Sequence, residues 1–132
     1  MLIGDLAAAA GLSAKTIRFY EQAGLLPAPP RTPGGYRDYP PQTAARLAFI
    51  RQAQAAGLTL AEIGGILRIR DSGQAPCQHV TALIGQHLAQ VEQRIAELSA
   101  TRKALAGLQR RAVATDPGDC ADAAICVILA SR

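Results

Sequence analysis

The sequence predicts a mainly helical protein with a small N-terminal head, one long amphipathic helix and a short C-terminal loop. Of its 132 residues, 49% are hydrophobic but only 4% are aromatic, so the core is built from small side chains that suit packed helices. Residues 27–41 hold six of the eight prolines and interrupt the helical pattern. Beyond residue 80, apolar residues recur at steps of four and three, which is typical of an amphipathic helix with one apolar face.

The first two predicted helices cover residues 3–10 and 14–22. Gly11 ends the first and Ser13 caps the second. Two short helices joined by a tight turn form a helix-turn-helix, whose second helix can enter the DNA major groove. That helix offers the side chains of Lys15, Thr16, Arg18 and Tyr20, while Ile17 remains as its anchor. Short helix pairs with glycine turns also occur in proteins that never bind DNA, so the motif alone leaves both interpretations open.

Residues 27–41 are predicted to form a two-stranded ribbon that turns at residues 33–35. The prolines and glycines of this segment exclude a helix. Its polar and aromatic side chains are Arg31, Tyr36, Arg37 and Tyr39. A ribbon of this kind after a helix-turn-helix resembles a wing, whose side chains can reach phosphates; the alternative is a solvated loop.

Two more helices complete the predicted head. One covers residues 42–56 and ends at Gly57. Thr59 caps the next, and Glu62 three residues later completes a capping box. We expect residues 1–70 to form a winged helix-turn-helix domain and residues 71–78 to form a linker.

The long helix is predicted over residues 79–110. Its apolar seam consists of Ile84, Leu88, Val91, Ile95, Leu98 and Leu105, with Arg102 at the one expected position that is not apolar. Thirty residues give a rod of about 45 Å, which the rest of the chain is too short to cover. A second copy is the obvious partner, so the seam predicts a homodimer through a coiled coil; the alternative is a helix packed along its own domain.

The charge is concentrated in the head. Residues 1–70 hold eight Lys or Arg and four acids, whereas residues 71–132 hold six of each. A basic head on a neutral helical stalk indicates nucleic-acid binding. No membrane-spanning run or export signal is apparent, so we expect a cytoplasmic protein with no membrane partner. The three cysteines are then expected to serve metal or redox chemistry rather than disulfides.

A set of short motifs in the head resembles the MerR family of transcriptional regulators. The motifs are Ile3-Gly4-Asp5-Leu6-Ala7, Gly11-Leu12-Ser13, Thr16-Ile17-Arg18-Phe19-Tyr20-Glu21, Gly24-Leu25-Leu26-Pro27, Gly35-Tyr36-Arg37-Asp38-Tyr39 and Gly57-Leu58-Thr59-Leu60-Ala61-Glu62-Ile63. They follow the family order almost without gaps over residues 1–70. The resemblance implies a mainly α fold with a winged helix-turn-helix head, a long antiparallel coiled-coil dimerisation helix and a short C-terminal metal-binding loop, here residues 111–132. We also expect no enzyme, because Cys126 as a nucleophile would need a base and a pocket, and both histidines lie around the start of the long helix.

The resemblance also implies which residues contact promoter DNA. Arg18 and Tyr20 match recognition-helix positions, and Tyr36 and Arg37 match wing positions that grip the backbone. Lys15, Thr16 and Arg31 are further candidates. Members of the metal-responsive branch bind promoters as homodimers and distort the DNA when metal binds, so that RNA polymerase can use the promoter.

The cysteines resemble those of the same branch. In an antiparallel pair the start of one long helix approaches the end of the other, so Cys77 of one chain would join Cys120 and Cys126 of the second. Three thiolates suit Hg(II), Pb(II) or Cd(II), whereas Zn(II) would need a fourth donor such as His79, an acid or water. Two alternatives stay open: a Cu(I) regulator that uses only the C-terminal pair, and a thiol redox sensor.

Overall fold

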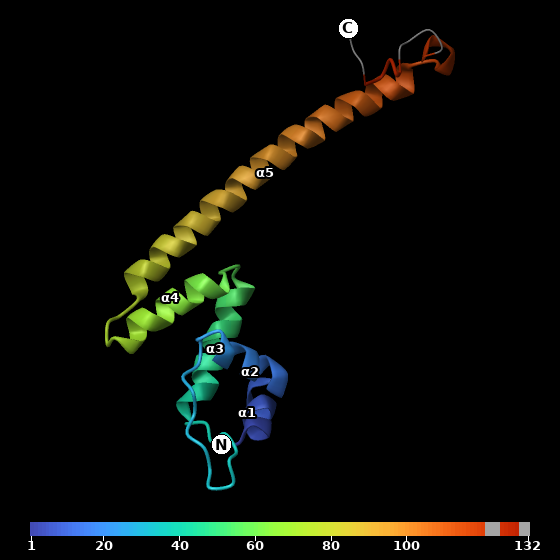
Figure 1. Cartoon of the computed structure of the whole chain (residues 1–132). Coiled ribbons are helices and arrows are strands. Elements are labelled where there is room, and N and C mark those ends of the chain that lie inside the picture. The colour runs from blue at the N-terminus through green and yellow to red at the C-terminus, as the bar shows by residue number, and fades with distance from the viewer. Residues whose placement is uncertain (121–124, 130–132) are drawn as a thin grey trace. The chain divides into compact units, whose positions relative to one another are not determined.

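The computed structural model describes residues 1–120 and 125–129, apart from the side chain of Cys120. The chain divides into two units, Met1–His87 and Leu88–Arg132, and Figure 1 shows the order of the elements along it. The helices of the described part are α1 (Ile3–Ala10), α2 (Ala14–Gln22), α3 (Gln42–Ala55), α4 (Leu60–Asp71), α5 (Cys77–Ala114) and the short 3-10 helix η1 (Pro117–Cys120).

The head has one apolar core, to which every helix of the first unit contributes. Helix α1 packs against α2 and α3, and α3 packs against α4. The side chains of Leu6, Ile17, Leu47, Ile50 and Ile63 have no exposed surface. Leu83, which lies near the start of α5, belongs to the same core. Burial of these branched side chains at about 1.5–3 kcal/mol each holds the short helices, which would not be stable alone.

The predicted caps are confirmed and explain where the helices begin. Gly11 has a φ of 66° at the end of α1, and the Ser13 Oγ accepts from the Thr16 amide at 3.1 Å. At α4 the Thr59 Oγ accepts from the Glu62 amide at 3.2 Å, and the Glu62 Oε1 accepts from the Thr59 amide at 2.9 Å. These bonds satisfy amides that a helix start leaves unpaired.

Glu62 also contacts the first turns of α5. The Nε2 of His87 lies 2.8 Å from the Glu62 Oε1 and 3.1 Å from its Oε2. The hydrogen bond from the Thr59 amide, followed by the one to His87, lowers the pKa of the Glu62 carboxyl. One carboxylate therefore caps α4 and holds His87, which is the last residue of the first unit.

Arg46 on α3 joins two other parts of the head. Its Nε donates to the Leu25 carbonyl oxygen at 2.7 Å, and its two terminal nitrogens donate to the Asp71 carboxylate at 2.8 and 3.0 Å. This bidentate pair lowers the pKa of the Asp71 carboxyl. The end of α4 is thus connected through α3 to the segment that follows α2.

The wing is less regular than the predicted ribbon. Its arms are joined by an isolated bridge between Arg31 and Arg37, and by backbone bonds from Thr32 to Tyr36 at 2.7 Å and from Asp38 to Pro30 at 2.8 Å. The described residues contain no extended strand here. The two arms pair, as a ribbon requires, but they do not form the regular two-stranded ladder that was predicted. The reason is that prolines lack the amide that a ladder needs.

Helix α5 is longer than predicted. It begins at Cys77, directly after Pro76, because a proline is tolerated before the first turn. It continues to Ala114 and stops before Pro117, which is the next proline in the chain. At about 1.5 Å per residue the helix is roughly 57 Å long. No helix in the described ranges has the length and apolar character required to span a membrane.

The predicted seam of α5 is exposed in the isolated chain. Its six apolar members, Ile84, Leu88, Val91, Ile95, Leu98 and Leu105, are each between 52% and 59% exposed. Leu83, by contrast, is buried in the head. A contiguous apolar stripe of this size marks an interaction surface.

Candidate DNA interface and metal-binding cysteines

The second helix of the helix-turn-helix presents a basic face. Lys15 and Arg18 are exposed, whereas Thr16 is half-buried and its hydroxyl lies 2.9 Å from the Ser13 hydroxyl. Ile17 has no exposed surface and anchors α2 in the core, as the sequence predicts. The polar side chains are therefore held on one side of α2 by an apolar contact on the other.

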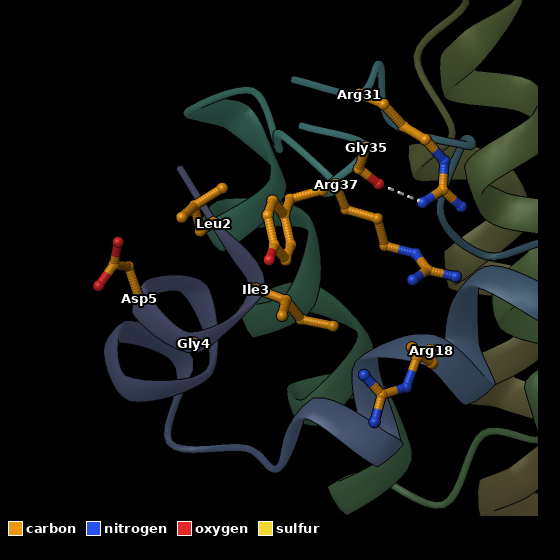
Figure 2. Close-up of a pocket in the computed structure, with 9 residues that line it drawn as sticks. Leu2, Ile3, Gly4, Asp5, Arg18, Arg31, Gly35 and Arg37 are labelled. Carbon is orange, nitrogen blue, oxygen red and sulfur yellow. Dashed lines mark hydrogen bonds between the residues drawn. The ribbon is translucent and has the colours of Figure 1, made fainter. Parts of the chain in front are cut away.

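The wing and α2 line one hollow of about 470 Å³. Figure 2 shows Arg31 and Arg37 on the wing and Arg18 on α2 around this space. Tyr36, which is 69% exposed, also lines it. Four of the seven residues predicted to contact DNA are thus brought together, and three of them are arginines. A concave surface with this charge suits the phosphate backbone.

Leu2, Ile3, Gly4 and Asp5 at the start of α1 line the same hollow. These four residues are not among the seven predicted DNA contacts. The Arg31 Nη1 donates to the Gly35 carbonyl oxygen at 2.8 Å, as the dashed line in Figure 2 marks. This bond orients the Arg31 side chain across the tip of the wing.

Glu21 connects the wing to α2. Its Oε2 accepts from the Arg37 Nε at 3.1 Å, and its Oε1 accepts from the Tyr39 hydroxyl at 2.9 Å. Burial, followed by the bond to Glu21, raises the pKa of Tyr39 to about 12. Glu21 is not among the predicted site residues, although an acid within an otherwise basic helix was an available signal. Glu21 holds Arg37 and the base of the wing against α2.

Tyr20 lies in the core. Its side chain is 5% exposed, and its hydroxyl donates to the Gln54 Oε1 on α3 at 2.8 Å. The neighbouring Phe19 is 51% exposed instead. A DNA contact through Tyr20 stays a prediction, and the structure gives its ring and hydroxyl a packing role.

One cysteine lies at the start of α5, and two follow its end. Cys77 is exposed as the first residue of α5, and its carbonyl oxygen accepts from the Thr81 hydroxyl at 2.8 Å. Cys120 is the last residue of η1, and Cys126 is half-buried in the segment after it. His79 is two residues after Cys77 on the same helix, a spacing that does not place side chains face to face.

Within residues 1–120 and 125–129 of one chain, no three potential metal ligands lie together. The predicted set of Cys77, Cys120 and Cys126 therefore stays a prediction.

Comparison with known proteins gives the same family as the motifs. A model of the MerR HTH family regulatory proteins matches residues 1–69, and a second, described as MerR, DNA binding, matches residues 44–108. The mercuric resistance operon regulatory protein of Bacillus cereus is 38% identical over 83% of this chain and 83% of its own length.

Two solved structures resemble the chain. PbrR691 from Ralstonia metallidurans CH34, in complex with lead(II), has a TM-score of 0.73 and 42% identity, covering 83% of this chain and 86% of its own. HiNmlR, a MerR family regulator bound to promoter DNA, has a TM-score of 0.58 and 25% identity, covering 87% and 91%. The chain belongs to the MerR family of helix-turn-helix transcriptional regulators.

Proposed function

We propose that this regulator binds promoter DNA as a homodimer and activates transcription when a soft divalent ion binds its cysteines. Cys77 of each chain would hold the ion together with Cys120 and Cys126 of the partner subunit. The ion is Hg(II), Pb(II) or Cd(II), or Zn(II) with a fourth donor. Double-stranded promoter DNA and RNA polymerase at the promoter are the partners.

The DNA-binding part of the proposal is supported by the hollow between α2 and the wing. Arg18, Arg31 and Arg37 line it, and Glu21 fixes Arg37 relative to α2. Arg18 lies on the helix that enters the major groove in this fold and can read a base edge, whereas Arg31 and Arg37 lie on the wing and suit phosphates. Lys15, Thr16 and Tyr36 extend the same surface.

The metal part rests on one observation, which is the place of the cysteines relative to α5. Cys77 begins the helix, and the other two follow its last residue, Ala114. If two copies pair along the exposed seam in opposite directions, each Cys77 meets the C-terminal loop of the second chain. Three thiolates then converge, which is a donor set for soft ions. One relative is named for mercuric resistance, and another was solved in complex with lead(II). Both names support a soft divalent ion.

The three thiolates can act as a switch because they come from two chains. A ligand shifts a conformational equilibrium only through its different affinity for the two arrangements. A complete trithiolate set exists only when each C-terminal loop meets the opposite protomer, so ion binding favours that arrangement of the two heads. The recognition helices move with their heads, and DNA shape should change more than operator affinity.

A titration of the full-length protein in a thiol buffer tests the metal assignment. We expect two ions per dimer, with Hg(II), Pb(II) or Cd(II) bound more tightly than Zn(II), because three thiolates satisfy the first group without a further donor. A variant with all three cysteines replaced by serine is the control and should bind none of them at the same buffer strength. Binding of one ion by a single monomer would contradict the shared site.

Replacing Arg18 by alanine tests the DNA assignment. We expect operator binding to weaken by roughly 1–3 kcal/mol and the preference at one base pair to relax, since a base-edge contact is lost. Electrophoretic mobility shift with a set of substituted operators at fixed salt measures both effects.

Arg110→Ala removes the same charge from α5 and is the matched control, for which we expect unchanged operator affinity. Arg37→Ala should weaken binding to all sequences about equally, because a phosphate contact carries no sequence information. If Arg18→Ala bound the operator as the original chain does, α2 would not be the recognition helix.

A further inference from the structure

Arg102 is a charged residue at a seam position of α5. It lines a shallow hollow on this helix, between Leu98 and Leu105. Its side chain is exposed, and within residues 1–120 and 125–129 no hydrogen bond or ion pair involves it. A polar residue in such a seam reduces stability, but it can specify orientation and register when it finds a partner.

Helix α5 offers one acid that can serve as this partner. It contains only two acids, Glu92 and Glu97. Glu97 is engaged within its own chain, where its Oε2 lies 3.4 Å from the Arg94 Nη1 and its Oε1 lies 3.5 Å from the Gln93 Nε2. Glu92 is exposed and has no ion pair or hydrogen bond through its side chain in the described part of the chain. An unpaired base and an unpaired acid thus lie on the same helix, ten residues apart.

The charges distinguish between the two orientations of a helix pair. In a parallel, in-register dimer each seam residue meets its own copy, so Arg102 would face a second arginine, which is destabilising. In an antiparallel dimer the seam superposes on itself when Leu88 lies opposite Leu105 of the partner subunit and Ile95 lies opposite the partner's Leu98. Arg102 then lies opposite Val91 of the partner subunit, one residue or about 1.5 Å along the axis from the partner's Glu92.

Side-chain direction also favours this contact. Helical side chains lean toward the N-terminus of their own helix. In an antiparallel pair Arg102 therefore leans toward the partner's Glu92, and that glutamate leans back toward Arg102. Glu92 also lies one turn beyond Leu88 on the same side of the seam, since residues four apart are neighbours on a helix surface.

We propose that Arg102 pairs with Glu92 of the partner subunit, twice in each dimer, and that this pair selects the antiparallel register of the homodimer. The apolar residues alone permit slipped registers, because steps of four and three repeat along the seam. A slip that places Arg102 opposite Ile84 of the partner subunit moves the two charges eight residues, about 12 Å, apart. The proposal rests on the proposed homodimer through α5 and adds the device by which the chain recognises a second copy of itself.

Charge reversal in two differently tagged full-length chains tests the pair. Arg102→Glu alone and Glu92→Arg alone each place two like-charged pairs in their homodimers, so we expect each dissociation constant to rise roughly tenfold. When the two variants are mixed, the heterodimer regains both opposite-charge pairs. Native mass spectrometry should therefore show mainly heterodimer, and a chain that carries both changes should recover the original dissociation constant.

Mixing Arg102→Glu with Glu97→Arg is the matched control, because it reverses the other acid of the same helix. This mixture should show no preference for the heterodimer. A statistical mixture of dimers from Arg102→Glu and Glu92→Arg, with the original chain dimeric, would overturn the ion pair and leave the proposed function standing. A monomeric original chain would instead overturn the homodimer itself.

Discussion

Replacing Cys77 by serine should abolish the transcriptional response to Hg(II), Pb(II) or Cd(II) while operator affinity stays unchanged. The serine hydroxyl is a poor ligand for soft ions, so the two remaining thiolates would belong to one chain and would no longer link it to the other. Cys77 is exposed at the start of α5 and outside the core of the head, so the head should fold as before. In vitro transcription across a metal titration, with mobility shift on the same samples, measures both properties.

Cys120→Ser and Cys126→Ser should give the same loss of response. Ser72→Ala, a substitution of similar size at the end of α4, is the control and should leave the response to metal intact. A Cys77→Ser protein that still responds to these divalent ions would show that the C-terminal pair suffices, and would remove the shared site from the mechanism.

Replacing Val91 and Leu98 together by aspartate should convert the dimer to monomers and so abolish tight operator binding. Both side chains are about half exposed in the isolated chain, at 54% and 52%, and become buried only in a pair. Four aspartates per dimer would then lie in the seam without partners, at a cost of several kcal/mol. Sedimentation equilibrium measures the association.

The control places two aspartates on the opposite side of the same helix, at Gln86 and Gln93. These positions lie away from the seam, so the control protein should remain dimeric. If the Val91 and Leu98 variant also sedimented as a dimer, the apolar stripe would have been assigned the wrong role.

The helices of the head could be predicted because their signals are local. Ser13, Gly11 and the pair of Thr59 and Glu62 act on backbone groups within four residues of themselves, so the sequence alone shows where α1, α2 and α4 begin or end. Pro76 and Pro117 bound α5 in the same local way. The predicted ends of α5, residues 79 and 110, lie inside these prolines because they follow the apolar pattern, which fades before the helix does.

Contacts between residues far apart in the sequence could not be predicted from these local signals. The hydroxyl of Tyr20 bonds to Gln54, 34 residues away, and nothing near Tyr20 in the chain indicates that its ring turns inward while Phe19 stays exposed. The contacts of Glu21 with the wing likewise depend on how the segment 27–41 folds back onto α2. The proposed metal site takes its ligands from two chains, so the structure of one chain leaves it untested.

Glu62 couples the local opening of α4 to that of the first turns of α5. Its carboxylate closes the capping box of α4 and at the same time accepts a hydrogen bond from His87 of α5. Fraying of the first turn of α4 withdraws the acceptor from His87, and release of His87 removes one of the bonds that orient the cap. The two segments should therefore lose amide protection against hydrogen exchange together, as one cooperative unit. The junction between the head and its stalk then behaves as a single folding unit, although the two segments are separated by a stretch of the chain that is not helical.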